Sequence, residues 1–281
     1  MSLRFPATLG AGPRRHRALG AAACGTALAL IAALAGPAGA QASVADPAVA
    51  ALMAAGDSAL VRLDLESATA AYGQAHRTAP ASYEAAWKLA RAFADSATLS
   101  PKAAEQKRLC QQAESLARAA VALEPDGAKG HAFLAVALGK LALFEGGKRK
   151  VRLAHEIKAE ADSALALDRD EDLAHHVLGV WNRELVELSG FLRFFAAALY
   201  GGLPKASLED ALDHLGTAAR LHPEVIPHHV ELGITLAAAR RYPEAEMELE
   251  QALRMPTSWV TDDYYRAKAR DALARVRRKV R

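Results

Sequence analysis

The sequence is poor in cysteine and in aromatic residues, and it lacks long runs in which β-branched and polar residues alternate. It has only two cysteines in 281 residues, Cys24 and Cys110, so a framework of disulfide bonds cannot be what holds the fold. Aromatic residues make up 6% of the chain, and without alternating β-branched runs a sheet is not expected. The abundant alanine favours helices instead. The composition therefore predicts an all-α protein that is held by helix packing.

Sequence motifs for catalysis and for metal binding are missing as well. The chain contains no G-x-x-x-x-G-K-[ST] phosphate loop, no G-x-S-x-G nucleophile turn and no C-x-x-C pair. His155 and Glu156 resemble the start of an H-E-x-x-H zinc motif, but the second histidine is absent. We therefore expect a protein that is not an enzyme and that holds no cofactor and no metal.

The first 42 residues contain no acidic residue. Four arginines lie among the first 17 residues, an apolar run follows from Ala18 to Ala35, and small residues continue up to Ala42. This pattern is typical of an export signal that is cleaved after Ala40 or Ala42. The alternative is an uncleaved anchor, since residues 18–35 are about as long as a short membrane span. We expect an exported protein, periplasmic or secreted, with anchoring in the inner membrane as the alternative.

The formal charge of +3 comes from this N-terminal segment. When its four arginines are set aside, 31 of the 35 basic residues remain against 32 acidic ones. A chain so close to neutral gives no reason to expect nucleic acid as a partner. The basic C-terminal residues, Arg275 to Arg281, are best interpreted as complementing the negative pole of a last helix.

Repetition is the strongest positive signal in the chain. Five helical hairpins follow one another from residue 47 to 256, and they resemble the tetratricopeptide unit of about 34 residues. In the first hairpin the small residues Gly56, Ala68 and Ala75 allow two helices to approach closely. Small residues recur at matching offsets in the later hairpins, and residues 257–281 predict a last helix, from about Asp262 to Lys279, that caps the stack.

Three hairpins are longer than the standard unit. A polar connector from Asp95 to Glu105 and a charged spacer from Glu145 to Lys150 account for two of them, and residues 189–205 for the third. The third insertion is apolar and aromatic, with Phe191, Phe194, Phe195 and Tyr200. We expect it to fold back over the fourth hairpin, because large exposed apolar patches are uncommon. The alternative is an exposed face for a partner or a membrane surface.

Several short runs narrow the resemblance beyond the generic repeat. They are Trp87 to Ala92, Glu145 to Lys148, His155 to Lys158, Leu178 to Trp181, Ser189 to Arg193 and Leu199 to Pro204, with Ala211 and Pro223 downstream. These runs resemble the regulator of microtubule dynamics family over roughly Tyr83 to Arg275. The resemblance implies a tetratricopeptide-like protein, and its eukaryotic members are associated with microtubules and mitochondria. Because an exported protein would not meet a cytoplasmic cytoskeleton, we do not expect microtubule binding here.

In a stack of hairpins the first helices line a concave surface on which partners usually lie. Counting along these helices places six residues there as candidates for partner binding: Trp87, Arg91, Lys129, Lys140, His176 and Arg183. A tryptophan beside cations can anchor a peptide, because the ring supplies apolar contact and the cations bind carboxylates. The sequence thus predicts a scaffold that binds a partner protein or peptide. A membrane-surface adaptor and a metal- or small-molecule-binding protein remain as alternatives.

Histidines recur at one position of the repeat, at His131, His175 and His229. Neutral imidazoles are good metal ligands. Equivalent positions of successive hairpins lie about one hairpin width apart, so these side chains cannot share one ion directly. The recurrence therefore does not change the expectation that no metal is bound.

Overall fold

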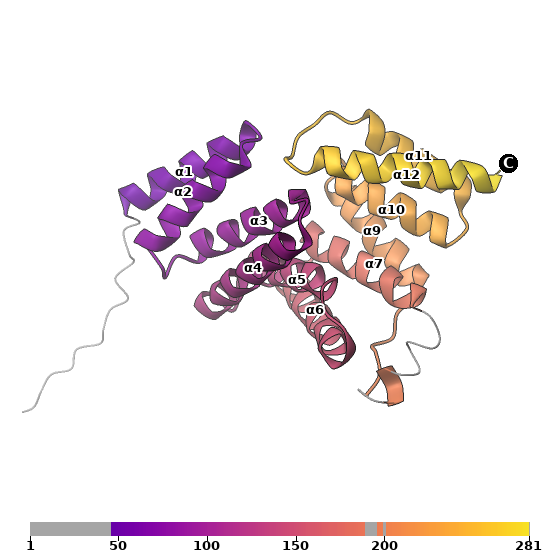
Figure 1. The fold of residues 1–281 in the computed structure, drawn as a ribbon, viewed down its shortest axis with the longest axis horizontal. Helices are drawn as coiled ribbons and strands as arrows, with labels where there is room; N and C mark the ends of the chain where they lie inside the picture. Colours follow the sequence, from indigo (N-terminus) through magenta and orange to yellow (C-terminus); the bar gives the residue numbers. More distant parts are fainter. Residues whose placement is uncertain (1–45, 189–195, 199–200, 281) are drawn as a thin grey trace, which may run out of the picture. The chain divides into compact units, whose positions relative to one another are not determined.

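The computed structural model describes residues 46–188, 196–198 and 201–280. The predicted export signal and the aromatic side chains Phe191, Phe194, Phe195 and Tyr200 lie outside these residues, so those predictions stay predictions. Regular secondary structure in the described residues is helical throughout (Figure 1). The predicted all-α class is therefore confirmed.

Within the described residues, the helices α1–α7 and α9–α12 form five antiparallel hairpins and one final helix. Their bounds are α1 (Pro47–Val61) and α2 (Leu65–Thr78), α3 (Tyr83–Leu99) and α4 (Ala103–Leu123), α5 (Ala128–Ala142) and α6 (Gly147–Leu167), α7 (Asp172–Glu187) and α9 (Leu208–Leu221), α10 (Ile226–Ala238) and α11 (Tyr242–Arg254), and α12 (Asp262–Val280). Each helix packs on its hairpin partner, and α3 contacts α5, α5 contacts α7, and α7 contacts α10. This is the arrangement of a tetratricopeptide solenoid.

Helix starts are marked by side chains that bind free backbone N–H groups. Asp46 accepts a hydrogen bond from the N–H of Ala48, and Asp64 accepts one from Ser67. Ser82 and Ser207 cap α3 and α9 in the same way. Each cap satisfies a donor that the helix itself leaves unpaired, so the hairpin boundaries are encoded locally.

Glycine sets how closely the helices of a hairpin approach. A Cβ at Gly56 would lie 2.3 Å from a ring carbon of Tyr72, which is fully buried on α2. A Cβ at Gly179 on α7 would lie 2.4 Å from Leu215 on α9. The close approach predicted from small residues is therefore present, and in these hairpins a large side chain fills the space over the glycine.

Two predicted spacers turn out to be largely helix. The segment from Asp95 to Glu105 extends α3 to Leu99 and starts α4 at Ala103, and Gly147 to Lys150 form the first turn of α6. The reason is packing. Ala97 is buried against Leu109 and Leu141, so the extra residues lengthen the core of the second and third hairpins instead of forming a polar loop.

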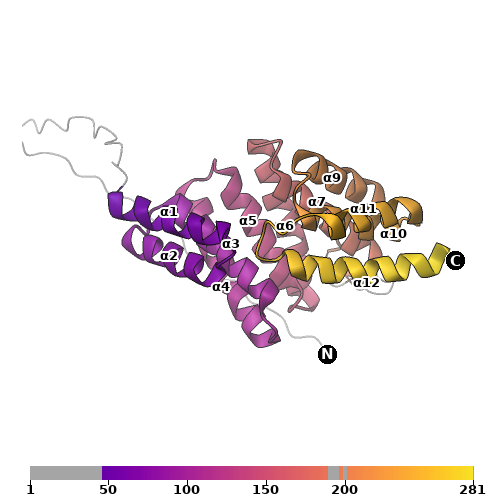
Figure 2. The same ribbon diagram turned by 90° about the horizontal axis from the view of Figure 1, so that it is seen from above.

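The last helix packs as a sixth first helix would, against α10 and α11 (Figure 2). Its buried side chains include Ala269, Ala272, Leu273 and Val276, and most of its arginines are exposed. The loop before α12 also contributes to the core, because Trp259 and Val260 pack against the apolar cluster of the first two hairpins. The C-terminal segment thus contacts helices near the start of the repeat domain.

Candidate functional site

The inner face is defined here as the side formed by the first helices α1, α3, α5, α7 and α10. The six residues that the sequence predicted for partner binding lie on three of these helices, α3, α5 and α7. Two of them bind neighbouring helices. Trp87 stacks in parallel on Phe133 of α5, with ring centroids 5.4 Å apart. Lys129 forms an ion pair of 2.8 Å with Glu171, the residue before α7. These two side chains therefore hold successive hairpins together.

Arg91 is arranged differently. Its guanidinium lies 3.7 Å from the ring centroid of Trp259 and 5.8 Å from that of Phe133. A guanidinium held against an aromatic face gains cation–π attraction while its N–H groups point outward in the plane. In the described part of the chain no acceptor is hydrogen-bonded to Arg91, so its donors are open to a ligand.

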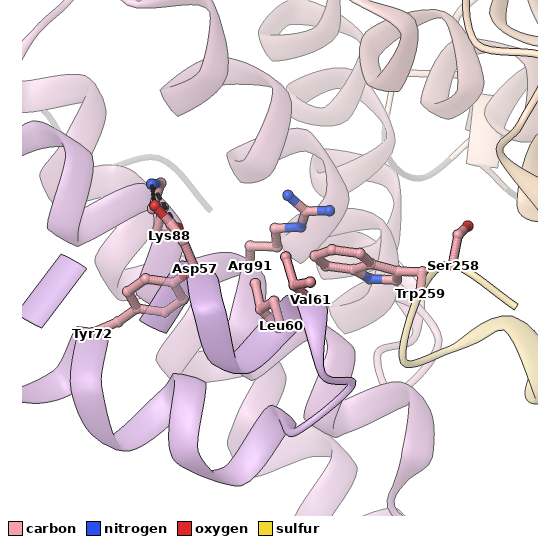
Figure 3. A pocket seen from close by; sticks show the side chains of 8 residues that line it. All are labelled: Asp57, Leu60, Val61, Tyr72, Lys88, Arg91, Ser258 and Trp259. Atoms are coloured by element: carbon pink, nitrogen blue, oxygen red, sulfur yellow. Dashed lines mark hydrogen bonds and ion pairs between the residues drawn. The ribbon is translucent and has the colours of Figure 1, made fainter. Parts of the chain in front are cut away.

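A hollow of about 210 Å³ lies beside this pair (Figure 3). Leu60, Val61 and Trp259 give it an apolar wall. Lys88 lies at its other end, where it is paired at 2.8 Å with Asp57. The hollow therefore combines apolar surface, a neutralised cation and the open guanidinium of Arg91.

Asp95 connects Trp259 to helix α3. Its carboxylate accepts a hydrogen bond from the indole N–H of Trp259 at 3.0 Å. Burial raises the pKa of Asp95, and the nearby charges of Arg91 and Lys140 act against that rise. Burial likewise lowers the pKa of Lys140, whose ammonium donates to the hydroxyl of Thr98 at 2.5 Å. The predicted groove residues Arg91 and Lys140 therefore both act electrostatically on the carboxylate of Asp95.

His176 belongs to a separate polar cluster, farther along the inner face. It shares a hydrogen bond of 2.9 Å with His228, which also contacts Asp172 at 2.8 Å. Burial lowers the pKa of His176 to about 3, and the neighbouring His228 adds to this effect. His176 is therefore neutral at physiological pH, and its ring is already hydrogen-bonded to a residue of its own chain.

Arg183 is also internal. Its guanidinium forms a buried ion pair of 2.8 Å with Glu231 of α10, and Lys268 of α12 binds the other carboxylate oxygen. Burial alone would raise the pKa of Glu231, but Lys268 and Arg183 hold that pKa at about 2. This triad ties α7, α10 and α12 together, so it is a structural element rather than an open binding surface.

The recurring histidines have a structural role that the sequence did not reveal. In each case Nε2 donates to the backbone carbonyl six residues earlier, from His131 to Pro125, from His175 to Arg169 and from His229 to Pro223. The Nδ1 atoms face Glu160, His214 and Glu248 on the second helix of the same hairpin, at 2.7 to 2.9 Å. Each histidine thus fastens a turn to its own hairpin.

Part of the aromatic insertion is described. Ala196 is buried, and Gly202 N–H donates to its carbonyl at 3.0 Å. His155 on α6 contacts the carbonyl of Gly202 at 3.2 Å. Among the described residues, no group of three or more histidine, cysteine or acidic side chains is placed to hold a metal ion. No helix in the same residues is long and apolar enough to cross a membrane.

The sequence interpretation missed three residues around this site. Trp259 lies against Arg91 and donates to Asp95, and Lys268 binds Glu231, the partner of Arg183. None of these three was among the predicted groove residues. Trp259 carried a usable signal, since a large aromatic residue in a short connector needs an apolar surface to cover it. Which surface it meets depends on how the hairpins curve, and that is not readable from the repeat pattern.

Residues 53–277 match the family described as regulator of microtubule dynamics protein 1-3. The chain belongs to this family. The match begins before Tyr83, where the resemblance was expected to start, and so includes most of the first hairpin.

Individual relatives are similar over part of their length. Regulator of microtubule dynamics protein 3 of Bos taurus is 29% identical over 178 residues, which are 60% of this chain and 36% of the relative. Regulator of microtubule dynamics protein 1 of Pongo abelii is 31% identical over 142 residues, or 50% of this chain and 45% of the relative. This chain thus spans less than half the length of these two relatives.

Among solved structures, a thermophilic tetratricopeptide protein of Thermus thermophilus has a similar fold. Its TM-score is 0.60 at 17% sequence identity, over 81% of this chain and 100% of that one. At this identity the likeness concerns the fold alone. It agrees with the helical solenoid described above.

Proposed function

We propose that this chain is a non-enzymatic scaffold that binds a segment of a partner protein at the inner face. The observation that carries the proposal is the hollow beside Arg91 and Trp259, which offers an apolar wall and an open guanidinium together. Aromatic residues and arginine are the side chains that most often dominate binding at protein interfaces. The tetratricopeptide fold, which presents its first helices as an extended surface, supports the same function.

The shape of the hollow favours a protein segment over a small molecule. Its volume of about 210 Å³ lies below the roughly 300–1,000 Å³ that is usual for small-molecule pockets. It is also open, since Val61 on its wall is 85% exposed. One apolar side chain of a longer segment would fill the hollow while the rest of the segment continues along the inner face.

Photo-cross-linking in cells tests the proposal. A photoreactive amino acid at Val61 would lie on the wall of the hollow, whereas the same residue at Met247, which is 68% exposed on α11, serves as the matched control. We expect discrete cross-linked species from Val61 that are absent from Met247. Equal products from both positions, or none from Val61, would remove the basis for a binding site here.

We further propose that the protein acts outside the cytoplasm, on the basis of the basic and apolar pattern of residues 1–42. The relatives are named for microtubule dynamics, and an exported chain would have a different partner. Mass spectrometry of the N-terminus of protein purified from native cells tests this. A mature chain that begins at Gln41 or Ser43 supports export, and an intact Met1 in a cytoplasmic fraction contradicts it.

A further inference from the structure

We propose that the loop of residues 255–261 is a latch, in which Trp259 reversibly holds the C-terminal segment against α3 and its release opens the inner face while the helices stay folded. We call residues 255–261 the latch loop. The inference goes beyond the proposed function, because it concerns a movement of the chain itself and needs no partner.

The latch loop is held in shape from its own side, by α12. The side chain of Asp262 accepts hydrogen bonds from the backbone N–H groups of Ser258 and Trp259 at 2.7 and 2.8 Å. Arg266 donates to the carbonyl of Met255 at 2.8 Å, and α12 itself packs on α10 and α11. None of these contacts involves α3, so the loop keeps its form and still presents Trp259 when it leaves α3.

The contact between the latch loop and the first two hairpins is centred on Trp259. Its ring lies 3.7 Å from the guanidinium of Arg91, and its indole N–H donates to Asp95 at 3.0 Å. Val260 adds apolar contact with the same hairpins. Successive hairpins are joined instead by whole helices, such as α3 on α5 and α5 on α7. A contact made by one loop is therefore the weakest point at which this stack can open.

Closing the latch also withdraws two charges from water. The ring of Trp259 contacts both Arg91 and Asp95, and burial raises the pKa of Asp95 and lowers the pKa of Arg91. Opening returns both groups to water, which offsets part of the contact that is lost. The closed state is thus favoured by a small margin, which is the condition for two populated states.

The latch also forms the hollow of the inner face (Figure 3). Leu60 and Val61 of α1 line one part of it, and Ser258 and Trp259 of the latch loop line another. The hollow is complete only while these two parts are together. A segment that fills it would contact both parts and would therefore favour the closed state.

Hydrogen exchange of the indole N–H groups in the unmodified full-length chain, followed by nuclear magnetic resonance, tests the latch. We expect the Trp259 indole to be protected about 30-fold relative to a free indole, which corresponds to an opening free energy of about 2 kcal/mol. Trp181 is the control, since it is buried and donates to the carbonyl of Ala154. It should exchange at least about 100 times more slowly than Trp259, because it is released only by global unfolding. Equal protection of the two indoles would overturn the proposal.

A distance measurement shows whether the release of Trp259 moves the hairpins. Spin labels on genetically encoded residues are placed at Gln74 of α2 and Arg278 of α12, which are both exposed, and pulsed electron paramagnetic resonance measures their separation. Trp259→Ala should shift the distribution to longer distances. Labels at Gln74 and the exposed Gln111 of α4 should keep their separation, which shows that the first two hairpins remain folded.

Trp259→Phe keeps a ring over Arg91 and should give a distribution between those of the unmodified protein and of Trp259→Ala. Unchanged distances between positions 74 and 278 in both variants would overturn the latch, even if the Trp259 indole exchanged quickly. Cross-linking from Val61 does not enter these measurements, so the proposed function fails separately, by loss of that cross-link.

Discussion

The indole N–H of Trp259 donates to the carboxylate of Asp95, 164 residues earlier in the chain, at 3.0 Å. The same ring covers the guanidinium of Arg91. Through these two contacts the loop before α12 is held against α3, so the C-terminal segment is linked to the second hairpin. The inner face is therefore a surface shared by the second hairpin and the C-terminal segment.

The first prediction concerns this link. Trp259→Ala should lower the free energy of unfolding by about 2 kcal/mol, because a half-buried ring and its cation–π contact are lost together. Trp259→Phe keeps a ring over Arg91 and loses only the hydrogen bond to Asp95, so it should cost about half as much. Denaturant unfolding followed by circular dichroism measures both. If both variants unfolded like the unmodified protein, the link would not stabilise the fold.

Two glycines in helix interiors should respond in opposite directions to the same substitution. A Cβ at Gly179 would lie 2.4 Å from Leu215 and 3.0 Å from the carbonyl oxygen of Ala211, so Gly179→Ala should cost about 1–3 kcal/mol. A Cβ at Gly139 of α5 meets nothing within 4 Å, and Gly139→Ala should stabilise by up to about 1 kcal/mol. Thermal unfolding of the pair tests the hairpin packing, and two changes of the same sign would contradict it.

Acid should weaken the fold through Glu231. Lys268 and Arg183 hold the folded-state pKa of Glu231 at about 2, below its ordinary value of 4.5. A carboxylate with a lowered pKa contributes stability that is complete above about pH 4.5 and is lost as the pH falls toward 2. Glu231→Gln should cost roughly 3 kcal/mol at pH 7. It should also flatten the stability profile below pH 4.5, and a profile as steep as that of the unmodified protein would contradict this role.

Raising the pH should destabilise the fold through His229. Although burial alone would lower its pKa, the Glu248 carboxylate and the carbonyl of Pro223 raise the pKa of His229 above the ordinary 6.5. A raised pKa gives stability that is complete below pH 6.5 and is lost as the pH rises through the folded-state value. His229→Gln should remove this loss between neutral and alkaline pH, as measured by urea unfolding at several pH values. The exposed His155→Gln serves as the control and should retain it.

The sequence predicted the repeat well because the signals for it are local. Gly56 and Tyr72 are close in the chain, and their contact follows from the spacing within one hairpin. The start of α12 at Asp262 is where the pattern placed it. The polar connector predicted from Asp95 to Glu105 was largely wrong, because its signal is not local. Most of its residues are helical because they are buried between hairpins, and composition does not show such burial.

The candidate site was predicted in part. Counting along the first helices predicted Arg91 and Lys140 as groove residues, but it could not show that Lys129 and Arg183 are already paired with Glu171 and Glu231. Those ion pairs join different hairpins, and Trp259 joins the last segment to the second. Contacts between residues so far apart depend on the curvature of the whole stack, for which a single sequence has no pattern.

The most direct test of binding at the inner face uses the indole signals of the three tryptophans, Trp87, Trp181 and Trp259, in a nuclear magnetic resonance titration. The ligand is the segment that becomes cross-linked at Val61. Trp181 is the internal control, since it is buried and donates to the carbonyl of Ala154. We predict that the Trp259 signal shifts to saturation while the Trp181 signal does not move. Saturating binding that leaves the Trp259 signal unchanged would contradict binding at this site.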